Sequence, residues 1–284
     1  VLLLRPDQIY DYIEAVKGRP GVLIGTLPEQ GLVNVMGLLH GAGWTTVYDV
    51  IDDWEAFHES GDMAHYDRDM ERHLMSDADV VTASARLLTH KVRDWTGRDA
   101  ILVPNGGPAE PVPDCPRPEQ LVIGDAGTCA YCGWLCGGWF DWDLLLRTAL
   151  EMPDVAFNII GAVDGRHHDY MAPNIHYHGE LPYPTALTYL KHCDVGLIPF
   201  RLDGISEAVD PIKWYDYIAC GLRVVATGCL TELAGRKGGL VADRDAESLS
   251  PWTEAALAEG PVRGVRRYLQ ETRWWRRPQA SPAA

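Results

Sequence analysis

Short apolar segments alternate with amphipathic, helix-like segments along most of the chain. In the first half, four short runs rich in apolar and β-branched residues predict β-strands. These runs are Val22–Gly25, Thr46–Val50, Val80–Ala83 and Ile101–Val103, and the clearest helix between them is Met63–Ser76. Strands that alternate with helices are typical of a parallel sheet with crossover connections, so we expect an α/β fold.

The second half of the chain repeats this alternation. Six strands are predicted at Ala130–Cys132, Val155–Ile160, Ile175–His178, Val195–Pro199, Val224–Thr227 and Leu240–Ala242, with helices that include Trp142–Glu151, Tyr183–His192 and Pro211–Cys220. The proline-rich segment 104–118 lies between the halves and is typical of a linker. We therefore expect two Rossmann-like domains, residues 1–115 and 116–262, followed by a helix and tail, 263–284. Such sheets bind ligands at the carboxyl ends of their strands, so we expect the site in a cleft between the domains.

One short pattern occurs in both halves. Ser76-Asp-Ala-Asp-Val-Val81 and Lys191-His-Cys-Asp-Val-Gly196 both run from the end of a helix through Asp-Val into an apolar strand. The pattern indicates that the two halves use the same connection between helix and strand.

The helix predicted at Pro211–Cys220 has polar residues on one side. Asp210 suits the N-cap, Pro211 the first helical position and Gly221 the position just beyond the end. With about 100° between successive residues, the core side is predicted to hold Ile212, Tyr215, Ile218 and Ala219, and the other side Lys213, Asp216, Tyr217 and Cys220.

Lys213 lies in the first turn of this helix, where a cation is unfavourable unless an anion is nearby. A phosphate group there would bind the free N–H groups of the helix and the ammonium together. Asp216, one turn further on, could accept hydrogen bonds from two adjacent hydroxyls, as carboxylates do with ribose. The alternative is a surface ion pair worth about 0.2–0.5 kcal/mol, and spacing alone does not choose between the two.

The segment Pro211-Ile-Lys-Trp-Tyr-Asp-Tyr-Ile-Ala-Cys-Gly221 resembles a known signature, Pro-x-Lys-x-Tyr-Glu-Tyr-Leu-Ala-x-Gly. This signature is that of GT-B glycosyltransferases of the bacterial polysaccharide and teichuronic-acid type, and further segments resemble the same family in the same order. The other matching segments are Val47–Trp54, Asp77–Ser84, Val103–Gly106, Tyr131–Trp134, Trp139–Leu145, Asn174–Gly179, Asp194–Phe200 and Thr272–Arg277. The resemblance implies a GT-B fold and spans most of the chain.

The resemblance also implies a function and a set of donor-binding residues. A hexosyltransferase-type enzyme would move a sugar from a UDP-, GDP- or TDP-linked donor to a hydroxyl of a polysaccharide, glycolipid or other acceptor, without a metal or other cofactor. Lys213 would bind the diphosphate and stabilise the leaving nucleotide, and Asp216 would bind the ribose. Further donor contacts are expected from Gly133, whose backbone would approach the diphosphate, and from Trp134, Pro199, Phe200 and Pro211. For Pro199 and Phe200, simple packing at the end of a strand is an equally good interpretation.

On the acceptor side, two carboxylates follow the predicted strand Thr46–Val50. We expect Asp52 to act as the general base of an inverting mechanism and Asp53 to cap the following helix. His58 is a weaker candidate, because a single surface histidine needs no catalytic role.

The chain departs from the family pattern at three places. Ala208 stands where retaining members carry the first of two glutamates, with Glu207 adjacent, and Asp216 replaces the second glutamate. The stereochemistry of transfer therefore stays open. The resemblance begins inside the N-terminal domain, so we expect that domain to be incomplete and its sheet edge open to a partner chain.

Two alternative functions stay open. The chain could be a non-catalytic nucleotide-sugar-binding or scaffold subunit, or it could be a nucleotide-sugar 2-epimerase.

Composition excludes some partners and leaves others open. A net charge of −15 over 284 residues disfavours nucleic-acid binding. No apolar run approaches the roughly 20 residues of a membrane helix, and Val1–Pro6 is too short for a signal peptide, so we expect a cytoplasmic protein. The arginine-rich end, residues 263–277 with Trp274 and Trp275, is predicted to be a solvated helix face or, alternatively, a peripheral contact with an anionic membrane.

The cysteines predict reduced thiols rather than disulfides or a metal site. Their number, seven, is odd, and no export signal accompanies them. Cys129, Cys132 and Cys136 lack a second ligand pair at zinc spacing, and His167-His168 is a poor substitute, so we expect no metal.

Overall fold

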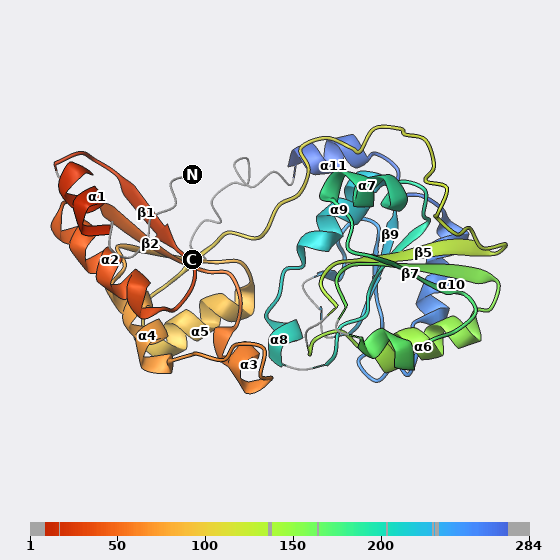
Figure 1. Ribbon diagram of the computed structural model, residues 1–284, viewed down its shortest axis with the longest axis horizontal. Helices are drawn as coiled ribbons and strands as arrows, with labels where there is room; N and C mark the ends of the chain where they lie inside the picture. Colours follow the sequence, from red (N-terminus) through yellow and green to blue (C-terminus); the bar gives the residue numbers. More distant parts are fainter. Residues whose placement is uncertain are drawn as a thin grey trace. The chain divides into compact units, whose positions relative to one another are not determined.

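The computed structural model describes residues 9–16, 18–135, 138–163, 165–202, 204–228, 230 and 233–271. The chain divides into two compact units, Val1–Pro104 and Asn105–Ala284, each built on a parallel sheet flanked by helices (Figure 1). The α/β fold expected from the sequence is therefore confirmed.

The first unit contains a four-stranded parallel sheet in the order β1-β2-β3-β4. Its strands are β1 (Val22–Gly25), β2 (Thr45–Val50), β3 (Val80–Ala83) and β4 (Ile101–Leu102), and its helices are α1 (Ile9–Val16), α2 (Gln30–Gly41), α3 (Trp54–Glu59), α4 (Arg68–Asp77) and α5 (Arg86–Thr96). All four strands lie at or within one residue of their predicted positions. Helix α4 begins later than the predicted Met63, because the Asp67 carboxylate accepts hydrogen bonds from the N–H groups of Asp69 and Met70 and so caps the helix there.

One face of this sheet exposes apolar side chains on its edge strand. Val22 and Ile24 of β1 are 58% and 63% exposed, and the register places them beside Thr45 and Val47 of β2. Parallel sheets normally have both faces covered. A partner chain at this sheet, expected from the sequence, stays a prediction.

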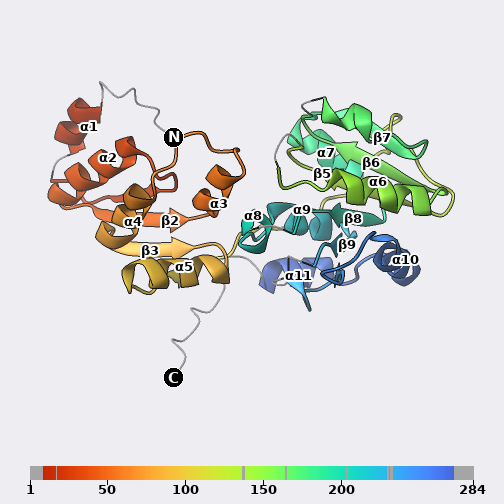
Figure 2. The same cartoon turned by 90° about the horizontal axis from the view of Figure 1, so that it is seen from below.

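The second unit contains a six-stranded parallel sheet in the order β10-β9-β8-β5-β6-β7. Its strands are β5 (Gly127–Cys132), β6 (Val155–Ile160), β7 (Ile175–Gly179), β8 (Val195–Ile198), β9 (Arg223–Ala226) and β10 (Gly239–Val241). Its helices are α6 (Trp142–Glu151), the 3-10 helix η2 (Arg166–Asp169), α7 (Tyr183–Leu190), α8 (Gly204–Glu207), α9 (Ile212–Cys220), α10 (Ser250–Glu259) and α11 (Val265–Glu271). Helices α7, α9 and α11 lie together on one face, and α6 and α10 on the other (Figures 1 and 2). The main hydrophobic core fills the space between these layers.

The start of the proline-rich segment packs on the second unit rather than the first. The Asn105 side-chain amide donates to the carbonyl oxygen of Asp210 (2.7 Å), and the N–H of Val112 donates to the carbonyl oxygen of Ala219 (2.8 Å). Gly107 lies against Tyr215 so closely that an added Cβ would be 2.2 Å from the Tyr215 Cβ. These contacts place residues from Asn105 onward in the second unit. The domain boundary predicted from the sequence lies later in the chain, near residue 115.

The repeated Asp-Val pattern has the same structural role in both units. In the first, the Asp79 carboxylate accepts hydrogen bonds from the N–H (2.7 Å) and hydroxyl (3.0 Å) of Thr46 on β2. In the second, the Asp194 carboxylate accepts from the N–H of Thr128 on β5 (2.9 Å). Each aspartate thus fixes the start of its own strand beside the start of the neighbouring strand.

The second sheet splits at one point of its carboxyl edge. From β5 the chain builds β6 and β7 on one side and then crosses to β8 on the other side of β5. Strands β5 and β8 pair only at Cys129–Val195 and Ala130–Gly196, so they separate toward their carboxyl ends. Open α/β sheets bind ligands at such a switch point.

Candidate functional site

Helix α9 lies beside this split, and its beginning differs from the prediction. Pro211, with extended backbone (φ −69°, ψ 120°), is the N-cap, and no side chain caps the helix. The buried Asp210 carboxylate instead accepts hydrogen bonds from the Tyr215 hydroxyl (2.8 Å) and from Nη1 of Arg236 (2.8 Å). The predicted Asp210 cap is therefore wrong, because the extended Pro211 turns Asp210 away from the first helical turn.

The two sides of α9 are also less distinct than predicted. Tyr215, Ile218 and Ala219 are buried as expected, but Ile212 is 58% exposed. Tyr217 and Cys220, placed on the polar side by periodicity, are buried as well. The reason is that α9 packs on β8 and β9 and is also covered by α7 and α11, so it has little free surface.

Tyr217 fills the gap between β5 and β8. The N–H of Cys132 at the end of β5 donates to the Tyr217 hydroxyl (2.9 Å), which lies 3.3 Å from the carbonyl oxygen of Leu197 on β8 and donates to it. Gly196 leaves room for the ring, since a Cβ there would be 2.3 Å from a ring carbon. Tyr217 thus replaces the missing pairing between the strands and fixes α9 at the switch point.

One turn before Tyr217, the Lys213 side chain lies over the carboxyl end of β5. Its Nζ is 4.7 Å from the centre of the Phe200 ring and 5.4 Å from that of Tyr131, so both rings attract the ammonium. The next residue beyond β5 is Gly133, with φ +156°, and a Cβ there would lie 3.0 Å from Cε and 3.4 Å from Nζ of Lys213. The ammonium therefore lies directly beside backbone that only glycine leaves open.

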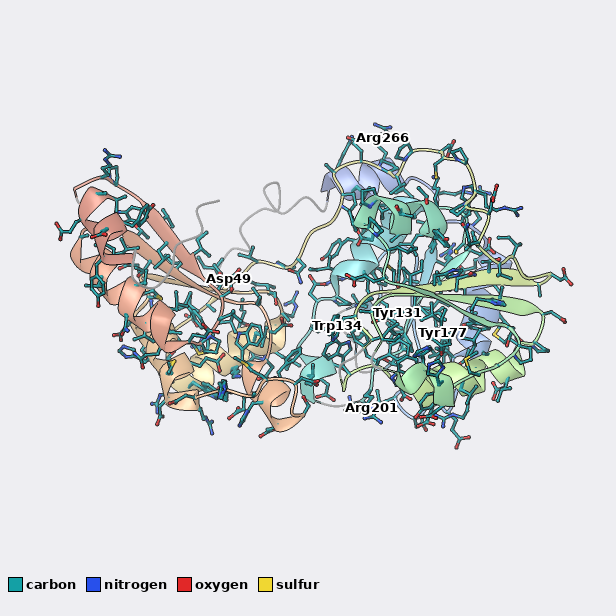
Figure 3. All side chains as sticks on the ribbon, viewed as in Figure 1. Asp49, Tyr131, Trp134, Tyr177, Arg201 and Arg266 are labelled. Atoms are coloured by element: carbon teal, nitrogen blue, oxygen red, sulfur yellow. The ribbon has the colours of Figure 1, made fainter. Side chains whose placement is uncertain are left out.

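Hydrogen bonds hold the loop after β5 in place. The Gly133 N–H donates to the carbonyl oxygen of Ile160 (3.0 Å), and the Tyr131 hydroxyl donates to the carbonyl oxygen of Trp134 (3.1 Å). Trp134 itself is exposed, at the end of the second unit's sheet where Tyr131 also lies (Figure 3). The loop is fixed by its backbone and leaves the indole ring accessible.

Asp216 lies one turn after Lys213 and is half-buried. Its Oδ1 accepts a hydrogen bond from the Tyr183 hydroxyl of α7 (2.7 Å). Burial raises the pKa of the Asp216 carboxyl above its ordinary value, while the Tyr183 hydrogen bond and the Lys213 ammonium oppose that rise. Burial also raises the pKa of the nearby Cys132 thiol to about 11, so this thiol is neutral at pH 7.

The other donor residues expected from the sequence lie at the same edge. Phe200 is buried beneath the ammonium, and its N–H donates to the Thr227 hydroxyl (3.2 Å). Pro199 is buried, and its carbonyl oxygen accepts from the N–H of Asp141 (2.9 Å), so it contributes packing. The structure thus brings Gly133, Trp134, Phe200, Lys213 and Asp216 together in the second unit, and their roles stay predictions.

The acceptor-side candidates lie in the first unit, at the carboxyl end of β2. Asp53 caps α3, as predicted, by accepting from the N–H of Ala56 (3.4 Å), and it forms an ion pair with Lys91 (2.6 Å). Lys91 also lies 3.3 Å from the fully buried Glu71. Asp52 is half-buried beside this network, and its role as a base stays a prediction.

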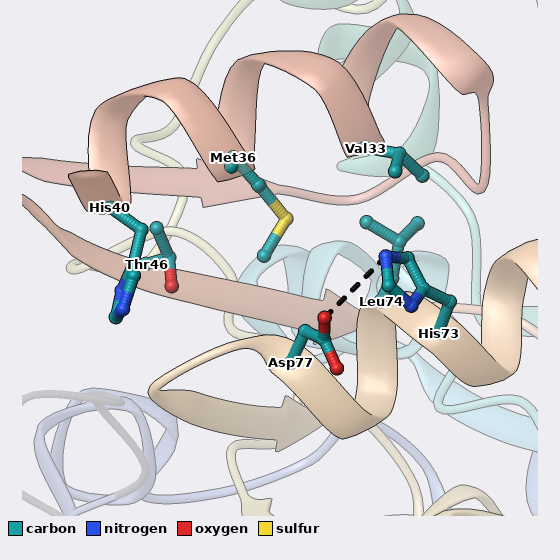
Figure 4. Close-up of a pocket in the computed structure, with 8 residues that line it drawn as sticks. Val33, Met36, His40, Thr46, His73, Leu74 and Asp77 are labelled. Atoms are coloured by element: carbon teal, nitrogen blue, oxygen red, sulfur yellow. Dashed lines mark ion pairs between the residues drawn. The ribbon is translucent and has the colours of Figure 1, made fainter.

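A pocket in the first unit lies away from every predicted site residue. It has a volume of about 330 Å³ and is lined by residues of α2, the start of β2 and α4, among them Met36, Thr46 and Leu74 (Figure 4). The ion pair between His73 and Asp77 (3.5 Å) stands at its rim. The pocket belongs to the amino end of the sheet, opposite to the end that binds ligands in parallel α/β folds.

Two sets of predictions from the sequence concern a metal site and contact with a membrane. Among the described residues, no group of three or more His, Cys, Asp or Glu side chains could hold a metal ion, and Cys136 lies outside them. Nor does any helix within the described ranges have the length and apolarity to cross a membrane. Arg266 of α11 pairs with Glu110 (2.6 Å), whereas Trp274, Trp275 and the rest of segment 272–277 are outside the described residues.

Three aromatic contacts of this site were not predicted from the sequence. The Tyr131 ring lies under Lys213, the Tyr217 hydroxyl joins β5 to β8, and the Tyr183 hydroxyl binds Asp216. Tyr217 could have been identified from the sequence, because it lies one helical turn after Lys213. Tyr131 and Tyr183 come from other parts of the chain, and only the topology of the sheet brings them here.

Ala208, at the position where the sequence resemblance led us to look for a glutamate, is buried. The adjacent Glu207 of α8 forms an ion pair with Arg244, which follows β10. The Glu207 carboxylate is therefore already bound within the second unit.

Part of the second unit matches a known protein family. Residues 141–258 match the family described as glycosyl transferases group 1. TuaH of Bacillus subtilis (strain 168), described as a teichuronic acid biosynthesis glycosyltransferase, is 27% identical over 93 residues, which cover 31% of this chain and 23% of TuaH. The matched region thus spans about a quarter of that relative's length.

Solved structures match nearly the whole chain. Anabaena Alr3699/HepE in complex with UDP has a TM-score of 0.62 at 13% identity and covers 93% of this chain and 76% of its own. A structure from Listeria monocytogenes described as a UDP-N-acetylglucosamine 2-epimerase has a TM-score of 0.54 at 9% identity and covers 94% and 71%. The chain thus has the GT-B fold, and its second unit carries the region that matches the glycosyl transferases group 1 family.

Proposed function

We propose that this chain is a glycosyltransferase that moves a sugar from a nucleotide-sugar donor to a hydroxyl group of a glycan or lipid-linked acceptor. The observation that carries this proposal is the position of Lys213, whose ammonium lies beside Gly133 where β5 and β8 separate. A diphosphate at this point would meet the ammonium, the backbone at Gly133 and the N-terminal turn of α9.

The nucleoside end of the donor is assigned to Asp216. A ribose carries two adjacent hydroxyls, and the Asp216 carboxylate lies one helical turn from Lys213, on the same side of α9. Anabaena HepE, which shares the fold, was solved with UDP and with UDP-glucose, and this supports a nucleotide-sugar donor. UDP-, GDP- and TDP-sugars are all consistent with these contacts.

The proposed reaction exchanges one bond to the anomeric carbon for another. The acceptor oxygen attacks that carbon, the bond to the diphosphate oxygen breaks, and the nucleoside diphosphate leaves with the bonding electrons. Lys213 stabilises the charge that develops on the leaving group, without a resident metal ion. For inversion, Asp52 of the first unit takes the proton of the acceptor hydroxyl.

We place the acceptor among the polysaccharides and glycolipids of the cell envelope, which the description of TuaH supports. The reaction would take place in the cytoplasm, because nucleotide sugars are charged and do not cross the hydrocarbon core. Arg263, Arg266 and Arg267, which are exposed, would assist contact with anionic lipid.

The proposal is tested by screening UDP-, GDP- and TDP-sugars in thermal-shift and turnover experiments. A donor present at 100 times its Kd stabilises the native state by about 2.7 kcal/mol. We expect donors of one nucleotide class to raise the Tm clearly. We expect the protein to release nucleoside diphosphate slowly from these donors in the presence of EDTA. If no donor of any class shifts the Tm, the proposal is wrong.

The same experiment separates the competing functions. A nucleotide-sugar 2-epimerase, an alternative that the description of the Listeria neighbour supports, would release a sugar with inverted C2. A non-catalytic binding subunit would bind the donor and leave it intact over hours. Mass spectrometry and NMR of the products distinguish these outcomes from transfer or hydrolysis with unchanged C2.

A further inference from the structure

An exposed tyrosine at the start of α7 is held by its hydroxyl. Tyr183 is 55% exposed, yet its hydroxyl donates to Oδ1 of Asp216 at 2.7 Å. A tyrosine on a surface normally keeps its hydroxyl in water and its ring against the protein. Here the hydroxyl is directed inward, to a carboxylate of α9, while much of the ring remains accessible.

The bond between Tyr183 and Asp216 persists across the physiological pH range. Burial of the hydroxyl and its bond to Asp216 raise the pKa of Tyr183 far above neutrality, so the phenol stays a donor. A carboxylate offers about four acceptor positions, and Tyr183 uses one of them. Asp216 therefore has further acceptor capacity for a pair of ribose hydroxyls.

The ring lies at the nucleoside end of the proposed site. Asp216 is one turn from Lys213, and the Tyr183 hydroxyl is bonded to Asp216 at 2.7 Å, so the ring lies next to the residue assigned to the ribose. A ribose bound at Asp216 carries the base of the nucleoside, which has two flat faces. An accessible aromatic ring fixed at one end is a suitable surface for stacking a base.

We propose that Tyr183 is a nucleoside-binding residue: its hydroxyl orients Asp216, and its exposed ring stacks against the base of the donor. This inference rests on the proposed function, since it assigns the nucleoside part of the same site. It adds a nucleoside-binding residue from a helix, α7, that carries none of the donor-binding residues expected from the sequence.

The test measures binding of two kinds of probe to the full chain by isothermal titration. UDP, GDP and TDP contain a nucleoside, whereas inorganic pyrophosphate contains only the diphosphate. For Tyr183→Leu we expect the best-bound nucleotide to bind about 10- to 100-fold more weakly, with pyrophosphate affinity within about 2-fold of the wild type. Tyr183→Phe keeps the ring and should lose only about 2- to 10-fold.

Two further variants complete the design. Tyr10→Leu removes an exposed ring of the first unit (64% exposed) and should change neither affinity. In the double variant Tyr183→Phe with Asp216→Asn, the loss should be no larger than in Asp216→Asn alone, because the hydroxyl acts through Asp216.

Each result decides the inference. Unchanged nucleotide affinity in Tyr183→Leu, or an equal loss for nucleotide and pyrophosphate, overturns the role of Tyr183 while the proposed function stands. A wild-type chain that binds neither nucleotide nor pyrophosphate overturns both. A selective loss of nucleotide binding, with the thermal unfolding of the variant unchanged, supports the inference.

Discussion

Replacing Lys213 with methionine is expected to slow turnover of a nucleotide sugar by about 100- to 1,000-fold and to weaken nucleoside-diphosphate binding by about 10- to 150-fold. A hydrogen bond to a charged group contributes about 1.5–3 kcal/mol, which sets the change in affinity. A group that stabilises charge in the transition state contributes about 10²–10³ in rate. Methionine keeps a flexible apolar side chain of similar length beside Tyr131 and Phe200, and it removes the ammonium with its attraction to the two rings.

The measurement is nucleoside-diphosphate release at saturating donor, together with isothermal titration of the product. Lys237→Met serves as the matched control, because Lys237 is an exposed lysine of the same unit that donates to the carbonyl oxygen of Gly264 (3.5 Å). We expect the control to retain wild-type turnover. A Lys213→Met variant with more than half of the wild-type rate would show that the ammonium does not serve the leaving group.

Replacing Asp210 with alanine is expected to give a large loss of stability, about 3–5 kcal/mol. The Asp210 side chain is fully buried and holds Arg236, whose side chain is only 19% exposed, and the Tyr215 hydroxyl. The substitution leaves a largely buried guanidinium without this carboxylate, and that penalty dominates. For a unit of this size the Tm should fall by roughly 6–20 °C.

Urea denaturation and thermal unfolding measure this effect. Asp243→Ala, at an exposed aspartate of the same unit, should change the free energy of unfolding by less than about 0.5 kcal/mol. Combining Asp210→Leu with Arg236→Met removes both charges and should cost less than Asp210→Ala alone. Equal losses for Asp210→Ala and Asp243→Ala would contradict a role of the buried pair in fixing the start of α9.

The Asp210 cluster also explains why Lys213 has a defined position. Asn105, Arg236 and Tyr215 come from three separate segments and converge on Asp210, three residues before Lys213. The N-terminus of α9 is thus held by Tyr215 of the helix itself and by two residues outside it, Asn105 and Arg236. A local rule could suggest a cap at Asp210 but could not foresee partners that are 26 and 105 residues away.

Most strands were predictable because they are short runs of apolar and β-branched residues between polar or glycine-containing turns, whereas β5 begins at Gly127, three residues before its predicted start. The repeated Asp-Val pattern was also informative, since Asp79 and Asp194 make equivalent hydrogen bonds to threonines in the two sheets. The patterns are local in the sequence, although the hydrogen bonds of Asp79 and Asp194 join residues 33 and 66 positions apart.

The faces of α9 were harder to predict because periodicity assumes one buried and one solvated side. This helix is enclosed on several sides, so Tyr217 is buried although it follows Asp216 on the polar side. The same enclosure places Tyr217 between β5 and β8, where it bonds to Cys132 and Leu197.

The central claim is that the separated ends of β5 and β8, with Lys213 above them, bind the diphosphate of a nucleotide sugar. A crystal structure of the protein with UDP tests this claim most directly. We predict phosphoryl oxygens within hydrogen-bonding distance of Lys213 Nζ, beside Gly133, and ribose hydroxyls on Asp216. Nucleotide bound elsewhere, with the Lys213 ammonium distant from every phosphoryl oxygen, would contradict the claim.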